Sequence, residues 1–80
     1  MYINLGGDRT VRSQSIIGIF DLDNTTSSKI TRSFLNRAEK RGTMITISEE
    51  ELPKSFILME DSLIYLSPVT PVTLLKRIER

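Results

Sequence analysis

The sequence predicts an α+β fold, with a small, mostly antiparallel sheet of about five strands and two helices. Short apolar runs separated by turn residues are typical of strands, and they fill most of the chain. Two other stretches have apolar residues at helical spacing. The length of 80 residues predicts one domain, residues 1–80. A core of this size is marginal alone, so self-association would not be surprising.

The first part of the chain predicts a hairpin followed by a buried strand. Residues 2–5 form the first strand, the Gly6-Gly7-Asp8 sequence is a turn, and residues 10–12 can pair back as a second strand. Residues 16–20 are apolar and interrupted only by Gly18. A glycine inside a strand suggests a bulge or a close backbone approach.

A helix is expected from about residue 28 to residue 41. Ser27 or Ser28 can cap its start, and Gly42 is placed to end it. One stripe at helical spacing is apolar, and it consists of Ile30, Phe34, Leu35 and Ala38. The opposite face is basic, with Glu39 as its only acid, and carries Lys29, Arg32, Arg37, Lys40 and Arg41.

The second half predicts a strand, a loop and a hairpin. Residues 43–47 alternate Thr, Met and Ile as a strand does, and residues 48–53 are an acidic loop. The apolar runs 56–59 and 63–66, separated by the turn residues 60–62, predict a β-hairpin.

The last helix is expected to begin at Thr70, its N-cap, with Pro71 at the first helical position. It spans only about nine residues, and isolated helices below about 12 to 15 residues are not stable in water. Its apolar stripe, Leu74, Leu75 and Ile78, must therefore dock. Either the chain's own sheet or a neighbouring subunit can receive it, so these residues are candidate oligomer contacts.

The amino-acid composition limits the kinds of catalytic and metal-binding site that the chain can form. The chain has no cysteine and no histidine, so we expect no disulfide, no thiolate or imidazole catalysis, no metal site and no cofactor. The start of the chain has neither the basic region nor the long apolar run of a signal peptide, and no apolar stretch is long enough for a membrane span. A cytoplasmic protein is therefore expected.

Two acidic motifs suggest chemistry only weakly. Asp21 and Asp23 follow an apolar strand at the spacing found in haloacid-dehalogenase-type phosphatases. Those enzymes need a parallel α/β domain about twice this length, and a polar turn at a strand end is the simpler interpretation. Three consecutive acids, Glu49, Glu50 and Glu51, point in different directions, unlike the spaced ligands of a calcium loop. We therefore expect no enzyme and no small-molecule substrate.

The basic face of the first helix is the better functional candidate. Cations on one helix face can neutralise phosphates without reading the base sequence. Lys29, Arg32 and Arg37 are therefore candidate DNA contacts. The net charge of only +1 means that any DNA contact must come from such local clustering. A solvated face that keeps a small protein soluble is the alternative.

Several short motifs, in order, resemble one family of small bacterial regulators. They are MYINLG at the start, GIFD at 18–21, AEKRG at 38–42, and the residues from PKS at 53–55 to the LLKR at 74–77. Together they resemble the RemA/RemB family of extracellular matrix regulators, with the RemB branch nearest. The resemblance implies a cytoplasmic regulator of extracellular matrix (biofilm) genes that binds promoter DNA and assembles into a closed, ring-like homo-oligomer.

The chain departs from the RemA-like pattern where that family contacts DNA. RemA-like chains carry arginines just before the apolar strand and in the loop before the hairpin. Here the nearest cation to the strand is Arg12, and the loop is acidic, with Lys54 alone at a basic position. Two functions therefore stay open: a DNA-binding ring that uses Arg12, Lys54 and the helix cations, and an oligomeric interaction or structural protein with weak or no DNA binding.

Overall fold

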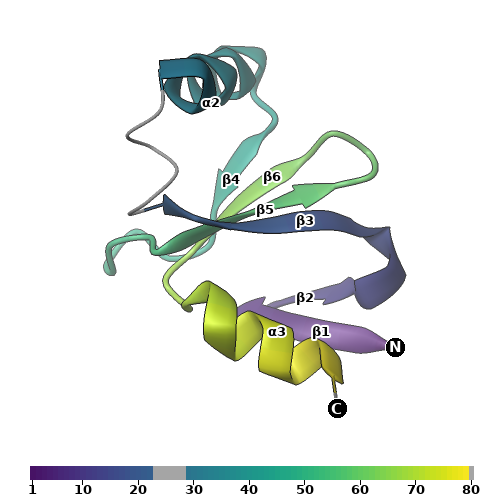
Figure 1. Ribbon diagram of the computed structural model, residues 1–80. Helices are drawn as coiled ribbons and strands as arrows, with labels where there is room; N and C mark the ends of the chain where they lie inside the picture. Colours follow the sequence, from purple (N-terminus) through teal and green to yellow (C-terminus); the bar gives the residue numbers. More distant parts are fainter. Residues whose placement is uncertain (23–28, 80) are drawn as a thin grey trace.

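A four-stranded sheet forms the centre of the computed structural model, which describes residues 1–22 and 29–79 (Figure 1). Its strands lie in the order β3, β5, β6, β4. β3 (Ile16–Asp21) and β6 (Ile64–Ser67) each pair antiparallel with β5 (Ser55–Met59), and β4 (Met44–Thr46) pairs parallel with β6.

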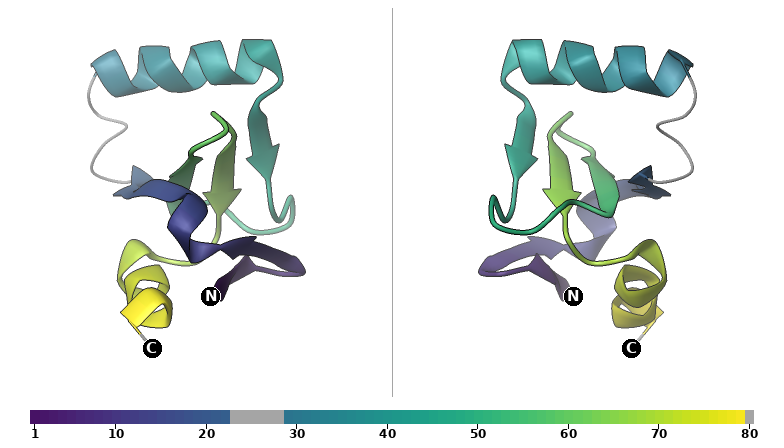
Figure 2. Two further views of the ribbon diagram at one scale, coloured as in Figure 1. Left: turned by 90° about the vertical axis from the view of Figure 1, so that its right-hand side faces the viewer. Right: turned by 90° about the vertical axis from the view of Figure 1, so that its left-hand side faces the viewer.

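Both faces of this sheet are covered (Figures 1 and 2). α2 (Lys29–Arg41) lies over one face. The other face meets α3 (Pro71–Glu79) and a second, two-stranded antiparallel sheet of β1 (Tyr2–Gly6) and β2 (Arg9–Arg12). A 3₁₀ turn, Ser13–Ser15, links the two sheets. Both chain ends therefore lie on the same side of the central sheet.

Within the part of the chain that the structure describes, the α+β class and the two α-helices are confirmed, but the expected number of strands is too low. The described residues form six strands in two sheets, because residues 9–12 pair fully with β1 as a separate hairpin. The mostly antiparallel character is confirmed, since three of the four described strand pairs are antiparallel and the β4–β6 pair is parallel. The 48–53 loop crosses the end of β6 and places β5 beyond it, which makes β4 the parallel neighbour of β6.

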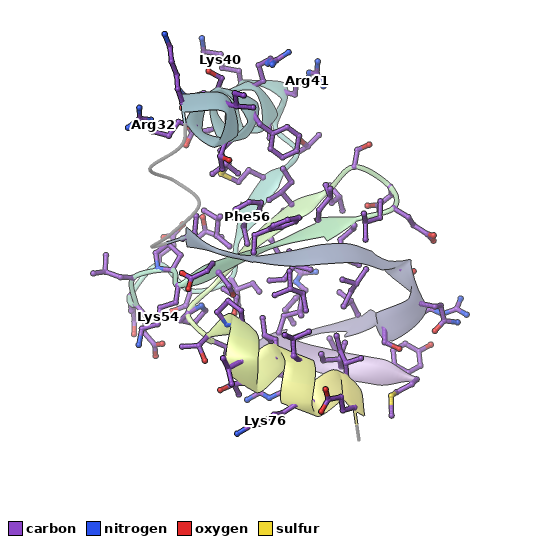
Figure 3. The ribbon with its side chains drawn as sticks, viewed as in Figure 1. Arg32, Lys40, Arg41, Lys54, Phe56 and Lys76 are labelled. Atoms are coloured by element: carbon purple, nitrogen blue, oxygen red, sulfur yellow. The ribbon has the colours of Figure 1, made fainter. Side chains whose placement is uncertain are left out.

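The β5–β6 hairpin is apolar on both faces, so it divides the core into two layers. On one face Ile57 and Tyr65 pack with Leu5 of β1 and Leu74 of α3. On the other face Phe56 and Ile64 pack with Ala38 of α2. Figure 3 labels Phe56 on this side of the sheet.

Two buried serines hold the first of these layers together. The Ser67 hydroxyl donates to the Leu5 carbonyl and accepts the Val69 N–H at 3.0 Å. The Ser55 hydroxyl donates to the Val69 carbonyl at 2.7 Å. Because all of these groups are bonded, the polar atoms can be buried without the cost of an unsatisfied donor or acceptor. They tie β1 and the start of α3 to the central hairpin.

The local signals for the helix ends are confirmed. The Thr73 N–H donates to the Thr70 hydroxyl at 3.4 Å, which caps α3. Gly42 has φ 75°, and the N–H groups of Gly42 and Thr43 donate to the Glu39 and Ala38 carbonyls at 3.1 and 3.0 Å. This is a Schellman cap. The expected cap of α2 at Ser27 or Ser28 lies outside the described residues.

The bulge predicted at Gly18 is also present. The β3–β5 register shifts between Ile16 and Gly18, which leaves Ile17 as the extra residue. A Cβ on Gly18 would lie 2.7 Å from the Phe20 ring, which stacks on Phe56 with centroids 4.8 Å apart. The glycine therefore leaves room for an aromatic pair on the α2 side of the sheet.

We expect Leu74→Ala to lower the free energy of unfolding by about 2–5 kcal/mol, because it removes a buried side chain from the core. Leu74 is 0% exposed, whereas its neighbour Leu75 is 50% exposed. Leu75→Ala is the matched control and should cost much less. Urea denaturation at several protein concentrations measures both, and an equal or larger loss for Leu75→Ala would contradict this packing.

Candidate functional site

α2 carries the densest group of cations among the described residues. All five of its basic residues are exposed, and Glu39 is its single acid: the cations are Lys29, Arg32, Arg37, Lys40 and Arg41. Figure 3 shows Arg32, Lys40 and Arg41 extending outward from the helix. Lys29 and Lys40 are about 16 Å apart along the axis at 1.5 Å per residue, a length that matches about five phosphates of one DNA strand.

The predicted DNA contacts do not form one surface. Lys29, Arg32 and Arg37 all lie on α2. Arg12 ends β2, on the opposite side of the central sheet, and Lys54 lies at one end of that sheet, beside the acidic loop (Figures 1 and 3). Lys40 and Arg41, which the sequence also assigned to the basic face of this helix, lie on α2 as well.

The apolar stripe of α2 is only partly covered. Ala38 is buried and Leu35 packs against the same cluster. Phe34 is 41% exposed and Ile30 is 82% exposed. The stripe predicted from helical spacing therefore packs on the sheet through its C-terminal half, and the remainder faces solvent.

A groove lies between α2 and the hairpin end of the central sheet. Its volume is about 390 Å³, within the range of about 300–1,000 Å³ typical of binding pockets. Leu58, Ile64 and Ala38 supply apolar lining, together with the exposed Phe34 and Ile17.

Two arginines border this groove. Arg37 and Arg41 follow Phe34 at intervals of three and seven residues, so all three lie on one side of α2. The prediction that all five cations lie on the face opposite the apolar stripe is therefore wrong for Arg37 and Arg41. Glu60 and Ser62 of the hairpin turn complete the border. The Glu60 carboxylate accepts a hydrogen bond from the Ser15 hydroxyl at 3.3 Å. The groove thus combines an apolar interior with a largely cationic helical wall.

The acidic loop lies at the other end of the sheet. Glu49, Glu50 and Glu51 are exposed, and Leu52 is 85% exposed. The strands fix this separation, because β5 begins at the loop and ends at the hairpin turn that borders the groove. Within residues 1–22 and 29–79, no cluster of acidic residues is arranged to hold a metal ion.

The three predicted oligomer contacts differ in accessibility. Leu74 is fully buried in the core of its own chain, so α3 docks on its own sheet. Ile78 is partly buried and Leu75 is half exposed, with Val72 beside it at the surface. Leu75 is thus the member of the stripe best placed to contact a neighbour.

Comparison with known proteins identifies the family. The family model of RemA-like proteins, described as extracellular matrix regulatory protein A-like, matches residues 2–78. The chain belongs to the RemA-like family. A relative, extracellular matrix regulatory protein B of Bacillus subtilis (strain 168), is 36% identical over 77 residues, which cover 96% of this chain and 89% of the relative.

The family membership confirms the resemblance seen in the sequence motifs. The matched residues include the parts of this RemA-like chain that form the candidate site, namely α2, the acidic loop and the hairpin. None of the described helices is long and apolar enough to cross a membrane.

We expect Asp21→Asn to reveal no catalytic role. Asp21 ends β3 opposite Ser55 in the sheet, and Asp23 lies outside the described residues. Both the unaltered protein and the variant should fail to hydrolyse p-nitrophenyl phosphate with magnesium, and their far-UV circular dichroism should agree. Magnesium-dependent hydrolysis that disappears in the variant would contradict this view.

Proposed function

We propose that this RemA-like protein is a cytoplasmic regulator of extracellular matrix (biofilm) genes that binds DNA as a homo-oligomer. The observation that carries the proposal is the group of five exposed cations on the 13 residues of α2, opposed on that helix by Glu39 alone. The name of the Bacillus subtilis relative, an extracellular matrix regulatory protein, supports the regulatory role.

The outward cations of α2 are the proposed phosphate contacts. Lys29, Arg32 and Lys40 lie away from the groove on the exposed side of the helix. Each neutralised phosphate releases condensed counterions, which makes binding favourable but sensitive to salt and blind to sequence. Two or three such contacts from one chain are weak. Repetition of the same helix around an oligomer multiplies them through effective concentration.

Arg12 and Lys54 are secondary candidates. Both are exposed, but they lie on other parts of the molecule than α2, and Lys54 follows three acids that oppose a phosphate backbone. They would reach DNA only where assembly brings them beside the α2 surface of another chain.

Self-association is supported by unpaired apolar surface at two separate places. Ile17, Ile30 and Phe34 are exposed on the α2 side of the central sheet, and Val72 and Leu75 are exposed on α3. An unreciprocated contact between one of these patches and a different surface of the next copy is head-to-tail, and it closes into a ring when the rotation permits. A ring is the assembly that we propose.

The second candidate function is an oligomeric interaction or structural protein that binds DNA weakly or not at all. The specific observation in its favour is the acidic loop, together with the net charge of +1. The two candidates share self-association and differ in the role of α2.

Light scattering tests the shared part. We expect a mass several times that of the 9.1 kDa chain at micromolar concentration, because the exposed apolar side chains on both sides of the sheet would be covered. A particle of 9.1 kDa throughout the micromolar range would contradict self-association.

DNA binding measured across a salt series tests the role of α2. The triple variant Lys29→Gln, Arg32→Gln, Lys40→Gln should bind duplex DNA more weakly. The slope of log affinity against log salt should flatten by about 0.9 for each phosphate that the variant no longer neutralises. Lys76→Gln on α3, far from α2 in Figure 3, is the matched control and should change neither quantity.

Arg12→Ala and Lys54→Ala, measured in the same series, show whether the secondary candidates contribute. If they flatten the slope and the triple variant does not, the DNA surface lies away from α2. If the unaltered protein binds no DNA at low salt, the interaction-protein function is the correct one.

A further inference from the structure

We infer that the acidic loop of one copy docks into the groove of the next copy, with Leu52 against the apolar interior and the glutamates against Arg37 and Arg41. This inference rests on the proposed self-association and names the surfaces that would form it. The occupant of the groove is thus a second copy of this chain.

The acidic loop combines an exposed apolar side chain with negative charge. A single exposed leucine is common on protein surfaces and explains nothing alone. Leu52, however, directly follows three exposed acids and is itself 85% exposed, so the segment presents an apolar tip beside a block of negative charge.

The groove offers the complementary pair. Its interior is apolar, and the cations Arg37 and Arg41 lie along its helical wall. Glu60 is the opposing charge at the border, and it bonds to the Ser15 hydroxyl. Two cations on α2 against one acid leave this border net positive, which favours a segment that carries three acids.

The contact must form between copies. Ser55, where β5 leaves the loop, and Leu58, which lines the groove, are three residues apart on β5, about 10 Å at about 3.3 Å per residue. The loop is also fixed at both of its ends, because the Ile47 N–H donates to the Leu66 carbonyl at 3.0 Å and the Lys54 N–H donates to the Ser67 carbonyl at 2.7 Å. The loop therefore cannot fold back into the groove of its own chain.

The placement also determines the type of assembly. The two surfaces differ and lie at opposite ends of one protomer, so each copy can receive one loop and donate another. When the contact is not reciprocated within one pair of copies, it is head-to-tail and builds a ring or a filament.

The docked loop would change the charge seen by DNA. Glu49, Glu50 and Glu51 would face Arg37 and Arg41 of the neighbour instead of solvent. Lys29, Arg32 and Lys40 would remain free on the outer side of α2. On this account the acids support DNA binding through assembly, whereas in an undocked loop they would only repel phosphates.

Charge reversal tests the inference. The groove variant Arg37→Glu, Arg41→Glu and the loop variant Glu50→Lys, Glu51→Lys should each weaken self-association at least tenfold, and their combination in one chain should restore it. All four residues are exposed, so the fold should persist by circular dichroism. The control Lys29→Glu, Lys40→Glu changes the same helix by the same charge and should keep the oligomeric mass.

Two neutral variants separate the outcomes further. Leu52→Ser should lower the oligomeric mass, since it removes the apolar tip. Replacing Glu49, Glu50 and Glu51 by Gln should weaken both assembly and DNA binding. An oligomer that tolerates all of these changes, or a Gln variant that binds DNA more tightly at unchanged mass, would overturn the loop docking and leave the groove to a different partner. A monomeric unaltered protein would instead contradict self-association itself.

Discussion

A hairpin that is apolar on both faces has to be covered on both faces, and the rest of this small fold depends on that constraint. One face of β5–β6 is covered well: β1 and α3 bring Leu5 and Leu74 onto Ile57 and Tyr65, and the buried serines satisfy the polar backbone at the junction. Loss of β1 or α3 would expose apolar surface of the hairpin, and the described part of this 80-residue chain has no other element to cover it. The larger of the two clusters of buried residues lies on this α3 face.

The other face is covered incompletely, and this is where function can arise. α2 touches the sheet mainly through Ala38 and Leu35, so Phe34 and the neighbouring groove stay open. The same helix carries cations on its outer side and on the border of the groove. One helix can thus serve two purposes on different faces: it can receive a neighbouring chain beside the sheet and present charge to phosphates outside. For the first of these purposes, the acidic loop at the far end of the sheet is the segment of the neighbouring chain that we propose α2 receives.

The sequence could predict those features of the fold that depend on a few neighbouring residues. The Thr70 and Gly42 caps, the Gly18 bulge and the β5–β6 hairpin are each set by a few adjacent residues, and all are present. The place of β4 beside β6 could not be predicted, because it depends on which way a loop crosses the sheet. The sequence could predict that α2 is basic, but not that Arg37 and Arg41 border a groove beside Phe34. Periodicity gives a stripe but not how much of it is covered, so the groove beside Phe34 could not be found.

The central claim is that a neighbouring chain completes the half-covered face, and a disulfide test between copies probes it most directly. The chain has no cysteine, so Leu52→Cys and Ile17→Cys, each introduced into a separate sample, place one thiol on the loop and one at the groove. When the two proteins are mixed and oxidised at low concentration, the account predicts that the mixed 17–52 disulfide forms in preference to either symmetric one, as read by mass spectrometry of the linked peptides. Equal or greater yields of the symmetric 17–17 and 52–52 disulfides would contradict it.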